Sequence, residues 1–517
     1  MPRFIVRALL ALSLTSAVSF AQAPAASTAA PPAPTPPAQP DSTTPFTLEE
    51  AIALALKKNF DIQVQQYTLA SAKDAVVIQQ AAFDPTINSS LRRSLNQQAS
   101  QTNRLDDLNR VAAVGPRSDT TTMSVGATLP RNPITNGTVS VNTNISRSAT
   151  NSTNALLNPS FNHGVSATLT QPLLNGAGRH MATAALQRAK LGVNIASIAY
   201  RKQVLQVITD TENAYYNLVA ARETLRIRQN SLEASQKLFE ENQARRTTGV
   251  ATDLDVLSSE VGVATSRSGV IQAEQSIRDA EDRLLSLLNA PDFEVRIGPV
   301  ALPDYRDGPP NFAQSYKLAR ESYPDTLSAE EAIKQLRLDL ETARRNQQPD
   351  LDLSATLGYT ARATSAGYEQ AIANLPNDHG NNWALGLNYS MPWGKHADKA
   401  RYRQAQSSVL SRQVQLEELE QTLLVSVRMQ IRAIETFLAT LQIRAKATEL
   451  AARQYDQQKA RYDAGLSTSR LVLLAQDDLE NARFQELSAR VSLRRALAEL
   501  HRLEGTSLQR FGVQLPQ

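Results

Sequence analysis

The stretches "ARRTTGVATDLDVL" (residues 244–257) and "ARYDAGLSTSRLVL" (residues 460–473) decide how this chain folds. Each begins with Ala-Arg, has Gly five positions after the Ala, Thr three after the Gly, and Leu five after that Thr. Gly readily takes the left-handed conformation that ends a helix, and Thr is a good cap for the start of the next helix. We therefore interpret each stretch as the turn of a helical hairpin.

The sequence on both sides of each turn is typical of long helices. Residues 177–246 contain no Pro, and residues 401–463 contain neither Gly nor Pro. At about 1.5 Å per residue, a helix of about 70 residues is roughly 100 Å long. Leu, Val and Ile recur every three or four positions over 416–441, which buries a stripe against neighbouring helices. Helical sequence resumes after each turn, to residue 289 and to about residue 503.

The second half of the chain also contains two segments that alternate between apolar and polar residues, "QPDLDLSATLGY" from Gln348 and "WALGLNYSMPW" from Trp383. An alternation that repeats every two residues predicts strands with one apolar and one polar face. The apolar faces carry Leu351, Leu353, Ala355, Leu357 and Tyr359 in one strand and Trp383, Leu385, Leu387, Tyr389 and Met391 in the other. A short helix, a break and a longer helix precede the strands, as they also do in the first half from Phe46.

The first half predicts more strands than the second. "FDPTINSSL" after Phe83 and "VSATLTQPLL" from Val165 correspond to the two strands above. Two further segments, "TTTMSVGATL" and "GTVSVNTNIS", predict an additional hairpin near residues 121–146. Its connecting segment "PRNPITN" is rich in Asn and Pro, so we expect this hairpin at an extracellular mouth with its tip in water. A place in the wall of the sheet is the alternative.

The ends of the chain predict a secreted protein. Arg3 and Arg7 precede the short apolar run "ALLALSLTSAV", which predicts a signal peptide over 1–21. Residues 22–44 are almost entirely Ala, Pro, Ser and Thr and predict a disordered linker. We expect a first structural repeat over 45–300, with a turn at 246–252, and strands over about 85–172. A second repeat over 301–505 has strands over about 350–392 and a turn at 462–468, and a tail follows at 506–517.

Composition argues against catalytic, metal-binding and nucleic-acid-binding functions. The 517 residues include no Cys, and 54 basic residues against 50 acidic ones leave no strong positive charge for nucleic acid. "NGAGRHM" (175–181) has Met181 where a dinucleotide-binding loop needs a third Gly, so we interpret it as a strand-to-helix junction. We expect no cofactor, no metal and no enzyme activity. The five His are scattered: His163, His180, His379, His396 and His501.

Taken together, the signal peptide, the duplicated halves, the alternating strands and the two "AR-xxx-G-xx-T" turns resemble the TolC family of outer-membrane channel proteins over about residues 45–505. The resemblance implies a mainly α fold with membrane β-strands, in which long helical hairpins form a coiled-coil barrel. It also implies a homotrimer in which four or more strands per protomer close a 12-stranded β-barrel. An open sheet edge in lipid would leave backbone groups unpaired, which independently favours closure by several copies.

The resemblance implies an outer-membrane exit duct of a tripartite efflux or type I secretion system, with a periplasmic helical extension. Its partners would be outer-membrane lipid, a periplasmic adaptor protein and an inner-membrane pump. The alternative is a periplasmic coiled-coil scaffold or adaptor without a pore. The alternating strands before Pro172 and Pro392 favour the channel, because a scaffold has no need of lipid-facing strands. The identity of the cargo does not follow from the sequence.

The resemblance also indicates functional residues at the two turns. We expect a contact between Tyr462 and Asp255 to hold hairpin tips together. Leu471 and Leu474 occupy positions where some family members have gate-lining aspartates. The candidate gate residues are Asp253, Asp255, Tyr462, Leu471 and Leu474. The candidate adaptor contacts are Arg245, Thr248, Gly249, Thr252, Arg461, Gly465, Ser467 and Thr468.

Overall fold

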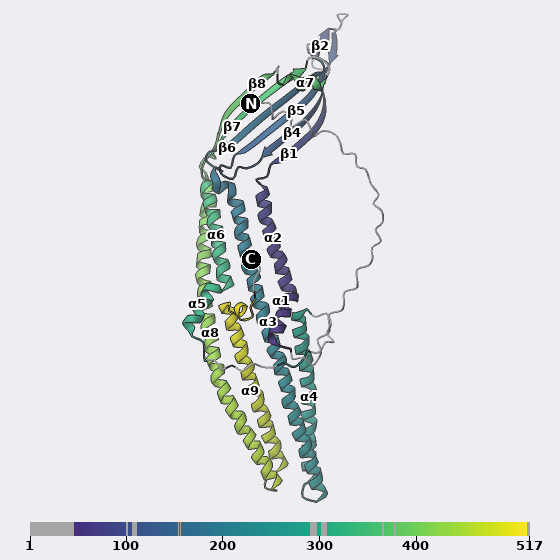
Figure 1. The fold of residues 1–517 in the computed structure, drawn as a ribbon, viewed down its shortest axis with the longest axis vertical. Coiled ribbons are helices and arrows are strands. Elements are labelled where there is room, and N and C mark those ends of the chain that lie inside the picture. Colours follow the sequence, from purple (N-terminus) through teal and green to yellow (C-terminus); the bar gives the residue numbers. More distant parts are fainter. Residues whose placement is uncertain are drawn as a thin grey trace, which may run out of the picture. The chain divides into compact units, whose positions relative to one another are not determined.

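The computed structural model describes residues 46–99, 102–105, 111–152, 155, 157–289, 297–300, 305, 308–363, 367–376 and 379–513. The predicted signal peptide and the linker that follows it lie outside the described residues. From Phe46 onward the chain is built from long helices that extend from one end of an antiparallel sheet (Figure 1).

The two halves repeat the same order of helices, as predicted. In the first half these are α1 (Leu48–Lys58), α2 (Phe60–Ala81), α3 (Gly178–Thr247) and α4 (Asp253–Leu288). In the second they are α5 (Phe312–Ser322), α6 (Pro324–Arg345), α8 (His396–Asp463) and α9 (Ser469–Glu504). Asn59 and Asn311 cap α2 and α5 through their side-chain oxygens, and Pro324 begins α6, where a missing N–H costs nothing.

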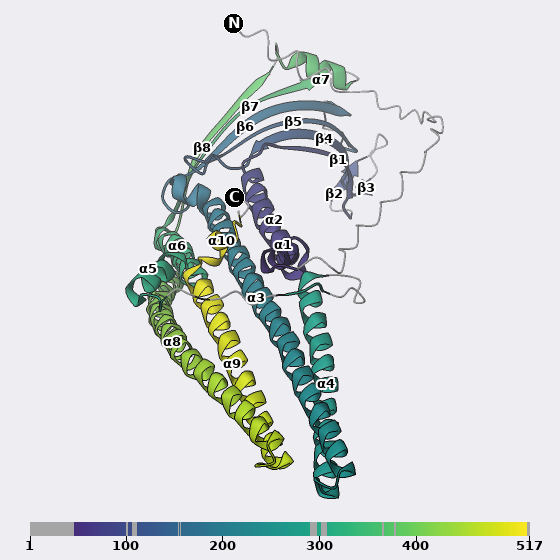
Figure 2. The same cartoon turned by 60° about the horizontal axis from the view of Figure 1, so that its bottom comes forward.

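The long helices form two hairpins, α3 with α4 and α8 with α9, whose turns lie at the end farthest from the sheet (Figure 2). The predicted stripe on α8 is confirmed: Leu423, Val427 and Ile434 are buried with Leu493 and Leu500 of α9. A second core forms where α1 crosses α3 and α4, around residues such as Ile52, Ile208, Tyr216, Leu218 and Leu284. Packing of these stripes, rather than one globular core, holds the helical part together.

The main sheet has six antiparallel strands in the order β1-β4-β5-β6-β7-β8. Their bounds are β1 Thr86–Gln97, β4 Arg117–Leu129, β5 Thr138–Thr150, β6 Ser160–Pro172, β7 Asp350–Ala363 and β8 Gly380–Ser390. A separate hairpin, β2 (Thr102–Leu105) with β3 (Val111–Val114), lies between β1 and β4 in the chain, and the short helix α7 (Tyr368–Asn374) lies between β7 and β8.

The predicted placement of the additional hairpin is wrong. Its strands are β4 and β5, which pair along their whole length with β1 and β6 inside the sheet. Its connecting segment lies at the helical end of the sheet, because the Gly178 N–H donates to the Thr135 carbonyl (3.2 Å) and Asn136 Nδ2 to the Gly176 carbonyl (2.6 Å). Thirteen residues in each strand are enough to cross a membrane, which needs about 9–11 tilted residues. The sheet therefore has six strands, and three copies would not give twelve.

The predicted faces are confirmed by the register. In all six strands the odd-numbered residues share one face and the even-numbered residues share the other, as in the pairs Leu357↔Trp383 and Ala355↔Leu385. The odd face is mainly apolar yet open to solvent, with Trp383 76% and Leu385 67% exposed. The even face is mainly Ser, Thr, Asn and Gly.

The strand-to-helix junction and the tail complete the fold. Gly176 and Gly178 have φ of +78° and +85°, and they turn the chain from β6 into α3, as predicted for "NGAGRHM". After Glu504 the tail folds back as α10 (Ser507–Arg510), and Leu508 packs into the core at α3. None of the helices in the described ranges combines the length and the apolar character needed to cross a membrane.

Candidate functional site

The first hairpin turn is fixed by a left-handed glycine and a capping box. α3 ends at Thr247, and Gly249 has φ +80°, which confirms the predicted left-handed conformation. Thr252 caps α4: its side chain accepts from the Asp255 N–H, and its own N–H donates to Asp255 Oδ2 (3.1 Å). Hydrogen bonds from Thr252 lower the pKa of Asp255 and keep its carboxylate charged. Arg246 pairs with Asp253 across this turn at 2.6 Å.

The second turn has the same backbone with weaker capping. α8 ends at Asp463, Gly465 has φ +76°, and Thr468 stands at the N-cap of α9 without a side-chain cap bond. Ser467 Oγ donates to Gln458 Oε1 (3.3 Å). A Cβ added at either Gly249 or Gly465 would meet nothing within 4 Å. Substitution at these glycines therefore acts through backbone strain and not through a clash.

Arg245 of the first hairpin fastens it to the second. Its Nη1 donates to the Tyr462 carbonyl (2.9 Å), its guanidinium lies 4.2 Å from the centre of the Tyr462 ring, and its Nη2 lies 3.7 Å from Asp463. Tyr462 is only 4% exposed and packs with Leu238 and Val472. One arginine thus combines a charge-assisted hydrogen bond, a cation–π contact and an ion pair between α3 and α8.

Tyr462 and Asp255 are connected through a third residue. No direct hydrogen bond joins them in the described part of the chain. The Tyr462 hydroxyl donates to Asn242 Oδ1, and Asn242 Nδ2 donates to the Asp255 carbonyl (3.3 Å). The Asp255 carboxylate instead accepts from Ser469 Oγ of α9 (3.0 Å). Burial raises the pKa of Tyr462, so its hydroxyl stays a donor. The predicted contact is therefore a network within one protomer.

The remaining predicted residues lie at the turns without joining the hairpins. Thr248 donates to the Arg245 carbonyl of its own turn (2.9 Å), and the exposed side chain of Arg461 has no polar partner within the residues described. Leu471 and Leu474 are 44% and 50% exposed. Sequence reasoning missed Asn242 and Ser469. It also missed the exposed apolar group beside the predicted leucines: Val250, Leu254, Leu257, Val261 and Leu466. The spacing of Val250 in the turn and of Leu254, Leu257 and Val261 on α4, three or four residues apart, is a signal that the sequence contains.

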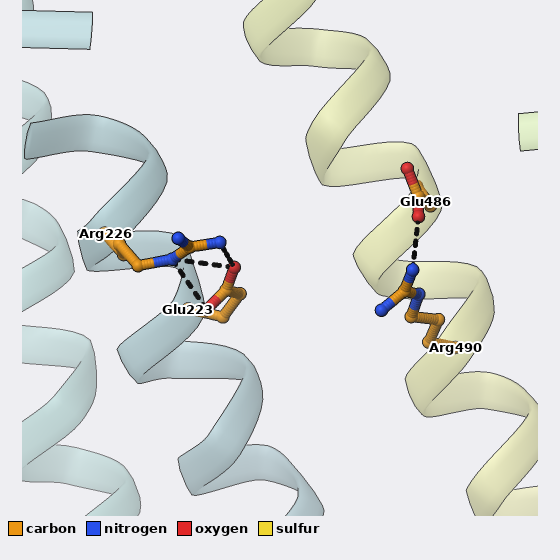
Figure 3. A network of polar contacts seen from close by, with 4 residues as sticks. All are labelled: Glu223, Arg226, Glu486 and Arg490. Atoms are coloured by element: carbon orange, nitrogen blue, oxygen red, sulfur yellow. Dashed lines mark hydrogen bonds and ion pairs between the residues drawn. The ribbon is translucent and has the colours of Figure 1, made fainter. Parts of the chain in front are cut away.

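Further from the turns, α3 and α9 face each other across a charged groove (Figure 3). Arg226 pairs with Glu223 inside α3, and Arg490 pairs with Glu486 inside α9 at 2.7 Å. Neither pair crosses the groove. The crossing contacts lie nearer the turns, where Arg228 pairs with Glu480 and the buried Gln476 Nε2 donates to the Ser231 carbonyl (2.7 Å) and Ser235 Oγ (2.8 Å). On the tip side of the groove the described α3–α9 contacts include these polar ones, whereas on the other side Val491 of α9 packs into the core with α3.

Similarity to known proteins points to one family. The sequence profile described as "Outer membrane efflux protein" matches residues 136–290 and 315–506. The chain is 26% identical over 309 residues to the pyoverdine export outer membrane protein OpmQ of Pseudomonas aeruginosa, covering 57% of this chain and 61% of that protein. It is 22% identical over 330 residues to the outer membrane protein TolC of Escherichia coli, covering 61% and 66%. Both alignments thus span less than two thirds of the relative.

Solved structures agree in fold over a longer range. The outer-membrane channel OprN superposes with a TM-score of 0.66 at 17% identity and covers 89% of each chain. The Campylobacter jejuni CmeC outer membrane channel gives 0.65 at 16% identity, covering 89% of this chain and 86% of that one. At these identities the likeness concerns the fold alone. The matched profile spans more than half of the chain and therefore shows the family. This protein belongs to the outer membrane efflux protein family and is located in the outer membrane, with a periplasmic helical extension.

Proposed function

We propose that this protein is the passive exit duct of a tripartite efflux or type I secretion system and works as a homotrimer without catalysis. One observation carries the proposal: a mainly apolar, solvent-open sheet face ends in two strands whose outer edges are unpaired, and helices of 70 and 68 residues lead from that sheet to tips that are joined to each other. Lipid would cover the apolar face, and neighbouring copies would pair the edges, because hydrocarbon does not tolerate unpaired backbone groups.

The edge strands are suited to closure by identical copies. β1 runs away from the helical end and β8 returns to it, so β8 of one copy and β1 of the next would pair antiparallel. Three six-stranded sheets supply eighteen strands. At about 4.8 Å between strands and a tilt of about 40°, the barrel circumference is about 110 Å and its radius roughly 18 Å, against roughly 12 Å for twelve strands. The outlet would be about one and a half times as wide as that of a twelve-stranded barrel.

The even face would then line a wet pore. Its only charged residues in the six strands are Arg92, Arg362, Asp350 and Asp352, which sum to zero. The rest is dominated by small hydroxyl, amide and glycine residues. Such a wall offers no strong electrostatic barrier to cargo of either sign.

The tips would open when a periplasmic adaptor docks and an inner-membrane pump delivers cargo. Exposed apolar residues near both turns, including Leu254, Leu257 and Leu466, offer a surface to the helices of such an adaptor. The fastening of Tyr462 by Arg245 and Asn242 would hold the entrance shut until then. A coiled-coil scaffold without a pore explains the helices but leaves the exposed apolar sheet face without a purpose.

Cysteine crosslinking tests the duct directly, because the chain contains no Cys. Ser90→Cys on β1 would be combined in turn with Asn382→Cys, Ala384→Cys, Gly386→Cys or Asn388→Cys on β8. We expect at least one pair to give covalent dimers and trimers and no larger species. Ser90→Cys with Thr356→Cys, in the interior strand β7, is the matched control and should stay uncrosslinked. Monomers from every pair, together with no conductance in planar bilayers, would exclude the duct.

A further inference from the structure

The odd face of the sheet carries one isolated group of charges. Among the odd-numbered residues of the six strands, the only Arg, Lys, Asp or Glu residues are Arg93, Arg117, Asp119 and Arg147. They lie on three adjacent strands, β1, β4 and β5. In the register Arg93 stands opposite Thr121, which stands opposite Arg147, and Asp119 and Arg117 follow along β4. We refer to these four residues as the arginine patch.

The patch begins where the apolar surface ends. Along β4 the odd residues from the helical end are Leu129, Ala127, Val125 and Met123, and the charges follow after Thr121. β5 changes in the same way from Ile145 to Arg147. β1 changes from Leu91 to Arg93, after which one more exposed apolar residue, Leu95, stands opposite Asp119. Since the helices lead into the periplasm, the patch lies at the outer end of the strands. From Leu129 to Thr121, which is level with Arg93 and Arg147, β4 runs about 27 Å along the strand, or about 21 Å of height at a tilt of about 40°. This height approaches the apolar band of an outer-membrane barrel, which is about 25 Å.

The charges of the patch are only partly compensated. Arg93 binds Asp119 in bidentate fashion, through Nε (3.2 Å) and Nη2 (2.9 Å). Arg117 and Arg147 are near enough to act on Asp119 electrostatically, but neither has a carboxylate partner of its own among the residues described. The patch therefore keeps a net charge of about two per copy. An arginine facing lipid at mid-membrane is costly, whereas at the interface the cost nearly vanishes.

We propose that the arginine patch binds the phosphate groups of a phosphorylated lipid headgroup in the outer leaflet. The planar guanidinium matches phosphate oxygens with two parallel N–H donors. The guanidiniums of Arg117 and Arg147, which have no carboxylate partner among the described residues, lie on neighbouring strands and can bind one phosphate or two adjacent ones. The odd face directs both side chains toward lipid and not into the pore. This inference rests on the barrel of the proposed function, but it concerns the outer surface and not transport.

Native mass spectrometry of the full-length trimer in detergent tests this site. The protein would be titrated with diphosphoryl lipid A and, separately, with the same lipid after removal of both phosphates. Wild type should bind the phosphorylated form more tightly. Arg117→Gln with Arg147→Gln should weaken that binding by about thirty-fold, since each arginine near a charged lipid surface contributes about fivefold. Arg117→Lys with Arg147→Lys should keep most of the binding, because the charges remain.

Arg92→Gln is the matched control, because Arg92 lies beside Arg93 on β1 but belongs to the even face. It should leave lipid binding unchanged. Equal binding of both lipids by wild type, or undiminished binding by the double glutamine variant, would overturn the site while trimers and conductance persist. Absence of trimers and of conductance in the wild-type protein would instead count against the proposed duct.

Discussion

Arg245→Ala should open the periplasmic entrance. The change removes a charge-assisted hydrogen bond to the Tyr462 carbonyl, a cation–π contact with its ring and a 3.7 Å ion pair with Asp463. Their typical contributions are about 1.5–3, 0.5–1 and 0–1 kcal/mol. Because the three contacts share one side chain, we take about 3 kcal/mol for their combined loss. If they exist only in the closed state, the closed-to-open ratio falls about 150-fold in each protomer. A tip that is closed about 99% of the time would then be closed about 40% of the time.

Single-channel recordings on purified full-length protein in planar bilayers measure this change as higher mean conductance. Arg461→Ala is the matched control, because Arg461 is an exposed arginine at the equivalent position of the other turn and leaves no described polar contact behind. Tyr462→Phe removes only the hydroxyl that donates to Asn242 and should give a smaller increase. Identical conductance of Arg245→Ala and Arg461→Ala trimers would show that the contacts of Arg245 do not hold the entrance closed.

Three further outcomes follow from the fold. Gly465→Val forces a β-branched residue into φ +76°, which costs about 1 kcal/mol or more. Export should therefore be lost while trimers still resist SDS. Normal export by this variant would show that the turn only connects two helices and has no role in opening. Leu385→Arg on the proposed lipid face should cost about 2–4 kcal/mol of stability and deplete assembled trimers in outer-membrane fractions. Asn388→Arg on the even face should reduce the amount of trimer only slightly. Equal depletion by both variants would contradict the assignment of faces. Glu212 is fully buried with no hydrogen-bond partner for its carboxylate among the described residues, and this burial raises its pKa to about 7. The folded state then holds a proton that the unfolded state has lost between about pH 4.5 and 7, so stability falls as pH rises through that window, by about 3 kcal/mol at most. Glu212→Gln should remove this fall, so that its melting temperature exceeds that of wild type at pH 8 but not at pH 4.5. The pKa of His501, lowered by burial to about 4, affects both proteins equally and cancels in the difference.

Periodicity was sufficient to predict the elements that bury one continuous stripe or face. The long helices end within a few residues of the expected positions because Gly249 and Gly465 supply a stop that propensity alone cannot. The faces of β7 and β8 followed from alternation, since register preserves it across the sheet. The same alternation was present in β4 and β5. Their Asn-rich connection predicts an extracellular tip, but a polar connection fits either end of a barrel equally well.

The tip network was only partly predictable because it depends on pairing between hairpins that are far apart in the chain. The family resemblance indicates Tyr462 and Asp255, yet the residue that joins them is Asn242, a buried amide within otherwise ordinary helical sequence. Burial distinguishes Asn242 from the many exposed polar residues of α3, and burial arises only when α8 packs beside α3. No local pattern in one segment contains that information.

The additional hairpin explains how the two halves could become unequal without disturbing the helices. Two inserted strands return the chain to the end of the sheet from which it left, so α3 still starts beside α6, which in turn packs against α8. Its connection also binds the junction it passes: Thr135 accepts from the Gly178 N–H and from Gln171 Nε2 (2.9 Å), and Asn136 holds the Gly176 carbonyl. An insertion of one strand would instead have placed α3 at the outer end. A hairpin is thus the smallest insertion that would widen the proposed barrel and keep the long helices at the same end of the sheet, and here it reinforces the point where strand becomes helix.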